Sequence, residues 1–409
     1  MMFKPSELTT YATMLVQLGV NLQPGQSLVI RASTDAVPMV RKVVEVAYQA
    51  GASNVMVDWS DDEVNRIRMS HAPEETLTWV SEGKVRDLIQ LMEEGAAVIS
   101  ILTPKPELLK GVDASRIATV TKVMGQALQR YHELAQGGKV SWSIGVIPTP
   151  EWARLVFPDL EEEKALAKLW ESIKVAIRLN EQDPVENWRD HVRQLEERTS
   201  WLNDHRFARL EYRAPGTNLS VELPKAHRWL GGGLKNGQGV FFLPNIPTEE
   251  VFTAPLREGV NGYVRNSKPL VYNGQVVDGF TLTFQNGQVV KAEAETGETL
   301  LQTLLEMDQG ASYLGEVALV PNDSPLSNLG VIFQNTLFDE NASCHFALGS
   351  AYPFCVEDGA FLSKEERLEK GLNASLIHVD FMIGAGELDI DGVTEDGQVI
   401  PLFRGGNWA

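Results

Sequence analysis

The sequence predicts an α/β protein of two domains: a parallel-sheet α/β domain in residues 1–210 and a mixed, largely antiparallel α+β domain in residues 211–409. The chain of 409 residues is longer than one hydrophobic core usually supports. Its first half alternates short apolar runs with helical patterns, which is typical of a parallel sheet covered by helices. In its second half, glycine-containing turn dipeptides multiply, and these favour antiparallel hairpins.

The first domain contains four apolar runs that we expect to be strands, namely residues 27–32, 54–58, 97–102 and 141–147. Helical patterns cover residues 6–18 and 37–50, and the second ends at Gly51, a residue that favours helix C-termini. A charged, helix-rich stretch from 159 to 205 then leads to the expected domain boundary near Leu210.

The second domain begins where helical patterns give way to glycine-containing turns and short strand-like runs. Asn286-Gly287 lies between two short strand-like runs, 280–284 and 289–292, and an Asn-Gly pair in that position indicates a tight hairpin. Similar dipeptides recur through this half, at Asn236-Gly237, Asn273-Gly274 and Asp278-Gly279. We therefore expect antiparallel strands with a few helices.

The composition excludes several classes of function. The formal net charge is −19, which argues against nucleic acids and anionic membranes as partners. No apolar run approaches the ~18 residues of a membrane span, and the N-terminus lacks a signal-peptide pattern. Cys344 and Cys355 are the only cysteines and form no CxxC motif, which favours free thiols in a reducing compartment. These features predict a soluble cytoplasmic enzyme.

The segment 376–383 gives the best chemical signal. In a strand, alternate side chains share a face, so His378 and Asp380 emerge side by side between Leu376 and Met382. The opposite face is wholly apolar. Burying an unpaired carboxylate and imidazole is costly, so the two must be paired. A metal ion would pair them, and a hydrogen-bonded His–Asp pair is the alternative.

Glu316 poses a similar problem. In the strand-like segment 313–320, it shares a face with Leu314, Ala318 and Val320. A carboxylate among apolar neighbours needs a cation or a proton, unless the strand lies at an edge and reaches water.

Two further segments bring acids and a histidine together. Glu340 and His345 lie in a stretch, 338–349, that is rich in small residues and loop-like, although an ordinary polar loop would look the same. Glu249 and Glu250 follow two prolines within an apolar and aromatic frame.

Other histidines give weaker signals. His71, His132, His191 and His205 occur in polar, helix-like surroundings, so we expect them at the surface, and His227 is left unassigned. The sequence contains no G-x-S-x-G and no H-E-x-x-H, which argues against a serine hydrolase and a gluzincin-type protease.

Four phrases, taken in order, resemble a known family. NIPTEEVFTAP (245–255), YLGEVALVP (313–321), LFDENASCHFALG (337–349) and LIHVDFMIG (376–384) are similar to the aminopeptidase T family, the M29 metallopeptidases. The resemblance extends over nearly the whole chain.

The resemblance implies a cytoplasmic homodimer that acts on peptide substrates with two divalent metal ions, zinc or cobalt, with manganese or magnesium as alternatives. Glu316 matches the ligand that bridges both ions, Glu340 an acidic position near them, and Tyr352 a tyrosine that binds the reacting carbonyl. The implied metal ligands are Glu250, Glu316, Glu340, His345, His378 and Asp380.

Alternatives remain for the activity. A related metal-dependent amidase or esterase would need the same ligands. A nucleotide-binding regulatory protein could use the parallel sheet, but no glycine fingerprint follows the first strand. For the general base, Glu249 and Glu340 are both candidates.

Overall fold

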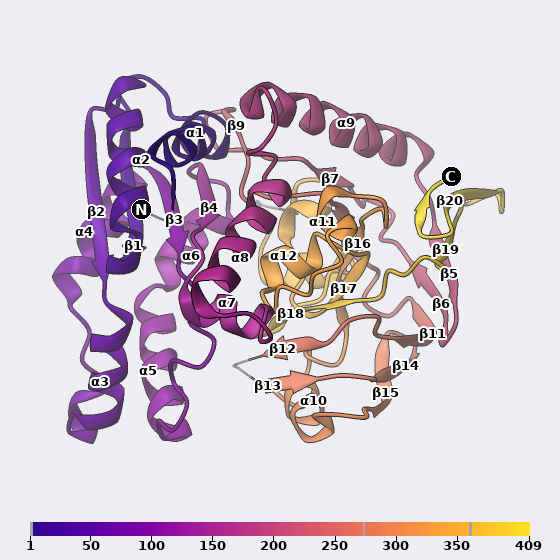
Figure 1. Cartoon of the computed structure of the whole chain (residues 1–409). Coiled ribbons are helices and arrows are strands. Elements are labelled where there is room, and N and C mark those ends of the chain that lie inside the picture. Colours follow the sequence, from indigo (N-terminus) through magenta and orange to yellow (C-terminus); the bar gives the residue numbers. More distant parts are fainter. Residues whose placement is uncertain (1–2, 273–274, 360–361) are drawn as a thin grey trace. The chain divides into compact units, whose positions relative to one another are not determined.

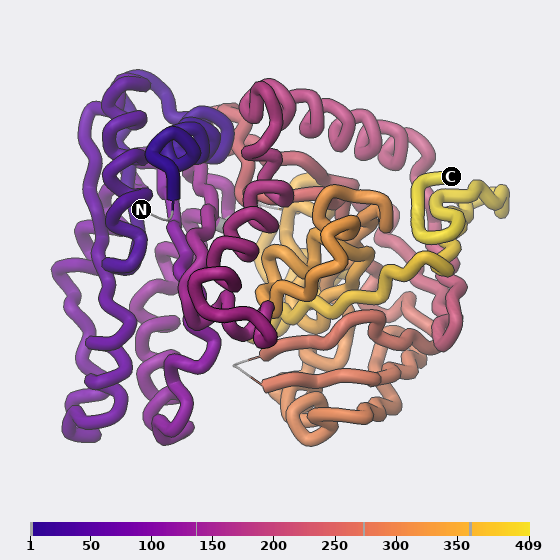
Figure 2. The backbone as a smooth tube through the Cα atoms, viewed as in Figure 1, coloured from indigo at the N-terminus to yellow at the C-terminus, as the bar shows by residue number. Residues whose placement is uncertain are grey.

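A computed structural model describes residues 3–272, 275–359 and 362–409 (Figure 1). The chain divides into two compact units, one formed by Met1–Trp188 with Gly233–Ile246 and the other by Arg189–Gly232 with Pro247–Ala409. Figure 2 follows the backbone through both units by colour. The first unit has a parallel sheet and the second has antiparallel sheets, which confirms the predicted fold class. Among the described residues, no helix combines the length and the apolarity of a membrane span.

The sheet of the first unit has four parallel strands in the order β2-β1-β3-β4. Each of the predicted apolar runs forms one of them: β1 (Ser27–Ser33), β2 (Asn54–Ser60), β3 (Ala97–Leu102) and β4 (Trp142–Val146).

Helices cover this sheet on both faces. Val29 and Val98 pack against Leu88 and Leu134 on one face, while the alternating Leu28 and its neighbours are buried on the other. The helices are α1 (Pro5–Met14), which continues as a π-helix (Leu15–Gly19), α2 (Val37–Gln49), α3 (Asp62–His71), α4 (Glu82–Glu93), α5 (Ala114–Ala127), α6 (Gln129–Gln136), α7 (Pro150–Val156) and α8 (Glu162–Ala176). The long helix α9 (Pro184–His205) includes the unit boundary at Trp188.

A returning segment completes the first unit. Residues 233–246 form the small pair β8 (Leu234–Lys235) and β9 (Phe241–Phe242). The Ile144 amide of β4 donates to Pro244 O at 2.8 Å, and the Leu243 amide donates to Gly19 O at 2.8 Å. This segment therefore covers the free edge of β4.

The second unit contains an eight-stranded antiparallel sheet in the order β15-β14-β11-β6-β5-β19-β20-β21. Residue 210, near which the sequence predicts a domain boundary, lies inside β5. The strands are β5 (Arg209–Ala214), β6 (Thr217–Glu222), β11 (Val260–Arg265), β14 (Thr281–Gln285), β15 (Gln288–Glu293), β19 (Asp389–Val393), β20 (Val399–Arg404) and β21 (Asn407–Trp408).

A five-stranded antiparallel sheet in the order β18-β17-β16-β10-β7 lies in the same unit. Its strands are β7 (Leu230–Gly231), β10 (Val251–Thr253), β16 (Leu314–Leu319), β17 (His345–Gly349) and β18 (His378–Met382). The unit also holds the pair β12 (Leu270–Tyr272) and β13 (Gln275–Val277), with helices α10 (Glu298–Leu305), α11 (Pro325–Asn328), α12 (Thr336–Glu340) and α13 (Lys364–Glu369).

The expectation of a loop-like stretch at 338–349 holds only for residues 341–344 and is wrong at both ends. Its first residues finish α12, and its last five form β17, a wholly buried strand between β16 and β18. The small residues 342–344 lie between α12 and β17 and lead from the helix into the strand.

The hairpin predicted from Asn286-Gly287 is confirmed, because these two residues join β14 to β15 with φ values of 50° and 81°. A side chain at Gly287 would have no room, since its Cβ would lie 1.8 Å from Arg257 O.

We expect Gly287→Ala to lower the free energy of unfolding by roughly 2–5 kcal/mol, the sum of the left-handed backbone cost and of overpacking. Gly397→Ala is the matched control, because Gly397 has φ +85° and no described atom within 4 Å of its Cβ. It should lose only the backbone part, ~1–2 kcal/mol. Denaturant unfolding curves measure both, and equal losses would contradict the close contact.

Candidate metal centre

One face of the five-stranded sheet brings acids and histidines together. In the strand register, Ala347 of β17 lies between Glu316 of β16 and Asp380 of β18. His345 lies two residues before Ala347, and His378 pairs with Gly349. Directly paired residues and alternate residues share a face of a sheet. The side chains of Glu316, His345, His378 and Asp380 therefore project from one face, where the other residues of β17 are only Ala347 and Gly349.

These side chains form two groups that could each hold a metal ion. The first is Glu250, Glu316 and His345, and the second is Glu316, His378 and Asp380; within each, the ligand atoms lie within 4.8 Å of one another. Glu250 joins from the residue just before β10, the strand next to β16. Glu316 belongs to both groups.

The two carboxylate oxygens of Glu316 face different histidines. Its Oε1 lies 3.4 Å from His345 Nε2, and its Oε2 lies 3.6 Å from His378 Nε2. The outer acids complete the pattern, because Glu250 Oε2 is 3.2 Å from His345 Nε2 and Asp380 Oδ1 is 3.2 Å from His378 Nε2. Both Nε2 atoms therefore point into the same acidic cluster.

Backbone carbonyls orient both imidazole rings. His345 Nδ1 lies 3.0 Å from Ser343 O, and His378 Nδ1 lies 2.7 Å from Ser350 O. With Nδ1–H donating to a carbonyl, the Nε2 lone pair is directed to the cluster, which is the usual arrangement of histidine ligands to metals.

Burial and charge both act on the pKa values of this cluster. Burial raises the pKa of Glu316. Burial alone would lower the pKa of His378, but Asp380 and Glu316 outweigh it and raise that pKa to about 10. For His345, burial is likewise outweighed by Glu250 and Glu316, so its pKa is well above the usual value. The carboxylates therefore favour a positive charge within the cluster. A divalent cation would supply that charge in place of the imidazole protons.

The residues fit a metal site by another criterion. Glu250 Oε2 and Asp380 Oδ1 are buried, and apart from the nearby histidine Nε2 atoms no group of the described residues is placed to donate a hydrogen bond to them. Buried carboxylate oxygens without donors are costly, and a cation satisfies them. A set of only nitrogen and oxygen ligands suits zinc, cobalt or manganese.

Glu340 and Tyr352 lie beside the two groups. Glu340 ends α12, and burial, followed by the charges of Asp380 and Glu250, raises its pKa well above the usual value. It is not a member of either three-residue group. The Tyr352 ring centroid lies 4.9 Å from that of His378, and burial together with the nearby acids raises the pKa of Tyr352.

The expectation of a surface position for His191 is wrong. Its side chain on α9 is 11% exposed, and its Nε2 lies 2.8 Å from Thr248 O and 3.4 Å from Glu249 Oε2. Glu249 is itself buried. The sequence signal was the apolar frame around Glu249 and Glu250, which indicated burial and hence a need for partners.

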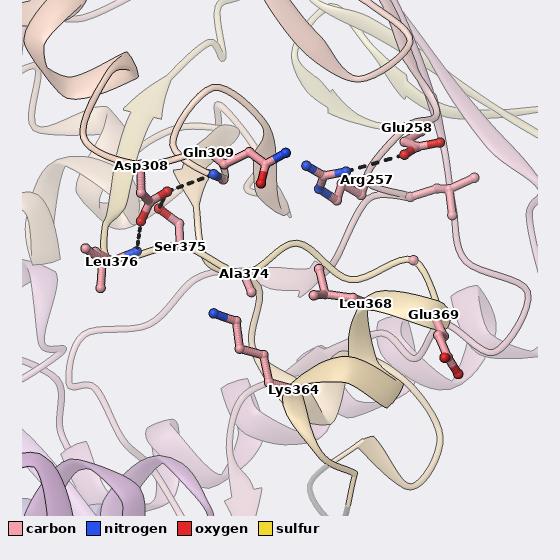
Figure 3. A pocket seen from close by; sticks show the side chains of 13 residues that line it. Arg257, Glu258, Asp308, Gln309, Lys364, Leu368, Glu369, Ala374, Ser375 and Leu376 are labelled. Carbon is pink, nitrogen blue, oxygen red and sulfur yellow. Dashed lines mark hydrogen bonds and ion pairs between the residues drawn. The ribbon is translucent and has the colours of Figure 1, made fainter.

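A pocket of about 710 Å³ in the same unit contains none of the clustered residues (Figure 3). On its wall, Asp308 accepts hydrogen bonds from the Leu376 amide and from Ser375 Oγ, the latter at 2.8 Å. Asp308 therefore holds the segment that leads directly into His378.

Comparisons with known proteins identify the family and the fold of the chain. Residues 4–408 match the family model described as thermophilic metalloprotease (M29). The chain is 51% identical to Aminopeptidase 2 of Geobacillus stearothermophilus and 48% identical to Aminopeptidase AmpS of Bacillus subtilis (strain 168), covering 98% of either chain in each pair. Its fold is similar to that of wild-type AmpT from Thermus thermophilus, with a TM-score of 0.93, 40% identity and coverage of 99% of both chains.

We expect Glu316→Gln to weaken metal binding at both three-residue groups by about 100-fold or more, above the ~10–100-fold typical of residues that only support a ligand. Zinc titration calorimetry on chelator-treated protein measures this. Asp391→Asn is the control, because Asp391 is a buried carboxylate of the same unit that pairs with Arg213 and Arg404 instead. Undiminished zinc binding by Glu316→Gln would contradict a shared ligand.

Proposed function

The chain belongs to the thermophilic metalloprotease family M29, and we propose that it releases N-terminal amino acids from peptides at a site that holds two divalent metal ions. Its activity is that of a metal-dependent aminopeptidase, the activity named for relatives that match it over nearly their whole length. The observation that best supports two ions is the position of Glu316, whose oxygens face a different histidine on each side.

In this proposal, Glu250, Glu316 and His345 hold one ion, and Glu316, His378 and Asp380 hold the other. When bound, the two ions lower the pKa of a water molecule and polarise the carbonyl of the scissile peptide. Zinc or cobalt are the first candidates, with manganese and magnesium as alternatives, because every ligand atom is nitrogen or oxygen.

Glu340 is our candidate for the group that takes the proton of the water, with direct metal ligation as its second possible role. Burial raises its pKa well above the usual value, so its carboxylate accepts a proton readily. Glu249 is less available, because its Oε2 lies beside His191.

Tyr352 is our candidate for the residue that binds the reacting carbonyl. Within the described part of the chain, no residue hydrogen-bonds its hydroxyl, and its raised pKa keeps that hydroxyl protonated. A protonated phenol beside the two groups can donate a hydrogen bond to the oxyanion that develops on the carbonyl.

We further propose that the enzyme is a cytoplasmic homodimer. The cytoplasmic assignment is supported by the two cysteines, Cys344 and Cys355, which are buried free thiols. The homodimer rests on the family resemblance alone.

Hydrolysis of aminoacyl-p-nitroanilides should be lost after chelation and return on addition of zinc or cobalt. Activity that is unchanged by chelation would refute the metal mechanism. N-acetylated peptides serve as controls: an aminopeptidase leaves them intact because it needs a free α-amine, whereas a general amidase would cleave them.

We expect Tyr352→Phe to lower kcat by ~10²–10³-fold, as the loss of one oxyanion donor does in other hydrolases. Its metal content should stay unchanged, because the ring contacts with His378 and Phe354 persist. Steady-state kinetics and metal analysis on the same preparation measure both. An unchanged kcat would remove Tyr352 from the carbonyl-binding role.

A further inference from the structure

We propose that two buried asparagines position the two metal-binding groups separately: Asn341 positions Glu250, and Asn373 positions His378. The inference rests on the proposed function, because it assumes that both groups bind metal. Neither asparagine is a metal ligand. Each acts on its ligand, Glu250 or His378, through hydrogen bonds to nearby backbone groups.

Asn341 ties the segment of Glu250 to helix α12. Its side chain is completely buried, and its Oδ1 accepts a hydrogen bond of 2.8 Å from the amide of Glu249, the residue directly before Glu250. Its Nδ2 donates to Leu337 O at 2.9 Å and lies 3.5 Å from Glu340 Oε1. One side-chain amide therefore connects the backbone directly before the proposed ligand Glu250 with the carboxylate of the proposed base, Glu340.

The Glu250 segment needs this connection. The strand that follows, β10, has only three residues, and Glu250 precedes it. Without Asn341 Oδ1, the buried amide of Glu249 would lack its acceptor, and the backbone would shift to find another. Such a shift moves Glu250 directly.

Asn373 fixes the carbonyl that orients His378. It is 3% exposed, and its Nδ2 donates to Gly349 O at 2.6 Å and to Gly310 O at 2.8 Å. Its backbone carbonyl accepts from the amide of Ala351 at 3.0 Å. Asn373 thus holds the residues on both sides of Ser350, whose carbonyl lies 2.7 Å from His378 Nδ1.

A second set of contacts holds Asn373 itself. Its Oδ1 accepts from Arg257 Nε at 3.1 Å, and the Arg257 guanidinium lies over the Tyr313 ring at 3.9 Å from its centroid. Tyr313 O in turn accepts from the Gly349 amide at 2.8 Å. Figure 3 shows Arg257 on the wall of the pocket, beside Glu258.

The two supports are independent. Among the hydrogen bonds between described residues, none joins Asn341 to residues 349–351 and none joins Asn373 to residues 248–250. Glu316 is the one residue common to both metal-binding groups. Each asparagine should therefore affect the affinity of one ion and leave the other nearly unchanged.

The test is stepwise zinc titration calorimetry on chelator-treated protein. Asn341→Ala and Asn373→Ala should each weaken one of two binding events by ~10–100-fold, the effect typical of residues that support a ligand. The two variants are matched controls for each other, because both remove a buried amide from the same unit.

Glu250→Gln identifies which ion is affected, since it should leave only the group of Glu316, His378 and Asp380 able to bind. In that background, Asn341→Ala should not change the remaining affinity, whereas Asn373→Ala should weaken it by ~10–100-fold. Equal effects of the two substitutions, or weakening of both events by either one alone, would overturn the proposal in favour of a general structural role.

A second pair of variants protects the test against misfolding. Asn341→Asp keeps the oxygen that accepts from Glu249 but places a second oxygen against Leu337 O and Glu340 Oε1, so it should regain only part of the affinity that Asn341→Ala loses. Asn373→Asp loses both Nδ2 donors and should behave like Asn373→Ala. Identical behaviour of the two aspartates would overturn the proposal.

The experiment distinguishes failure of the proposed function from failure of the positioning by the two asparagines. If the wild-type chain binds no zinc and hydrolyses peptides regardless of chelation, the metal centre itself is refuted. If it binds two zinc ions and all four asparagine variants bind them equally well, only the positioning by Asn341 and Asn373 is refuted.

Discussion

Neutralising buried carboxylates is the constraint on which the rest of the second unit depends. Glu250, Glu316 and Asp380 lie around two histidines on a sheet whose other face packs into a dry core of residues such as Phe346 and Phe381. Water cannot reach such acids freely, so positive charge must be supplied within the cluster. The raised pKa values of both histidines express the same demand. The strands, the short backbone links and the small residues of β17 can all be understood as means of holding these charges at fixed separations.

The five-stranded antiparallel sheet holds these charges in place through its strand register. Strand register alone places Glu316, Ala347 and Asp380 in one row, and the alanine between the two acids leaves room above it. A larger side chain at Ala347 would occupy the space that the proposed metal ions need. The reverse side of the same three strands buries Val317, Phe346 and Val379, so the hydrophobic core and the polar cluster share one backbone. Packing on the dry side thereby limits movement on the polar side.

Strand alternation made much of this predictable from the sequence. It placed His378 and Asp380 on one face and Ile377, Val379 and Phe381 on the other, and those three are buried. The strand–helix alternation of the first unit was equally readable, because its strands are short apolar runs. The conformation of His345 was not, since the small residues 342–344 directly before it permit a loop as well as a strand. Nor was the burial of His191, whose partners come from a segment more than fifty residues later. Contacts of that kind depend on tertiary packing, which periodicity does not encode.

The returning segment of residues 233–246 has a consequence for the order of events during synthesis. Translation produces the four strands of the parallel sheet well before Pro244 and Leu243, which cover the edge of β4 and contact Gly19. Until about a hundred further residues have been made, β4 presents unpaired backbone groups along one side. Such an edge can pair with another nascent chain. The first unit therefore matures only after part of the second has been translated, and a chaperone that shields β4 in the interval would raise the yield of native enzyme.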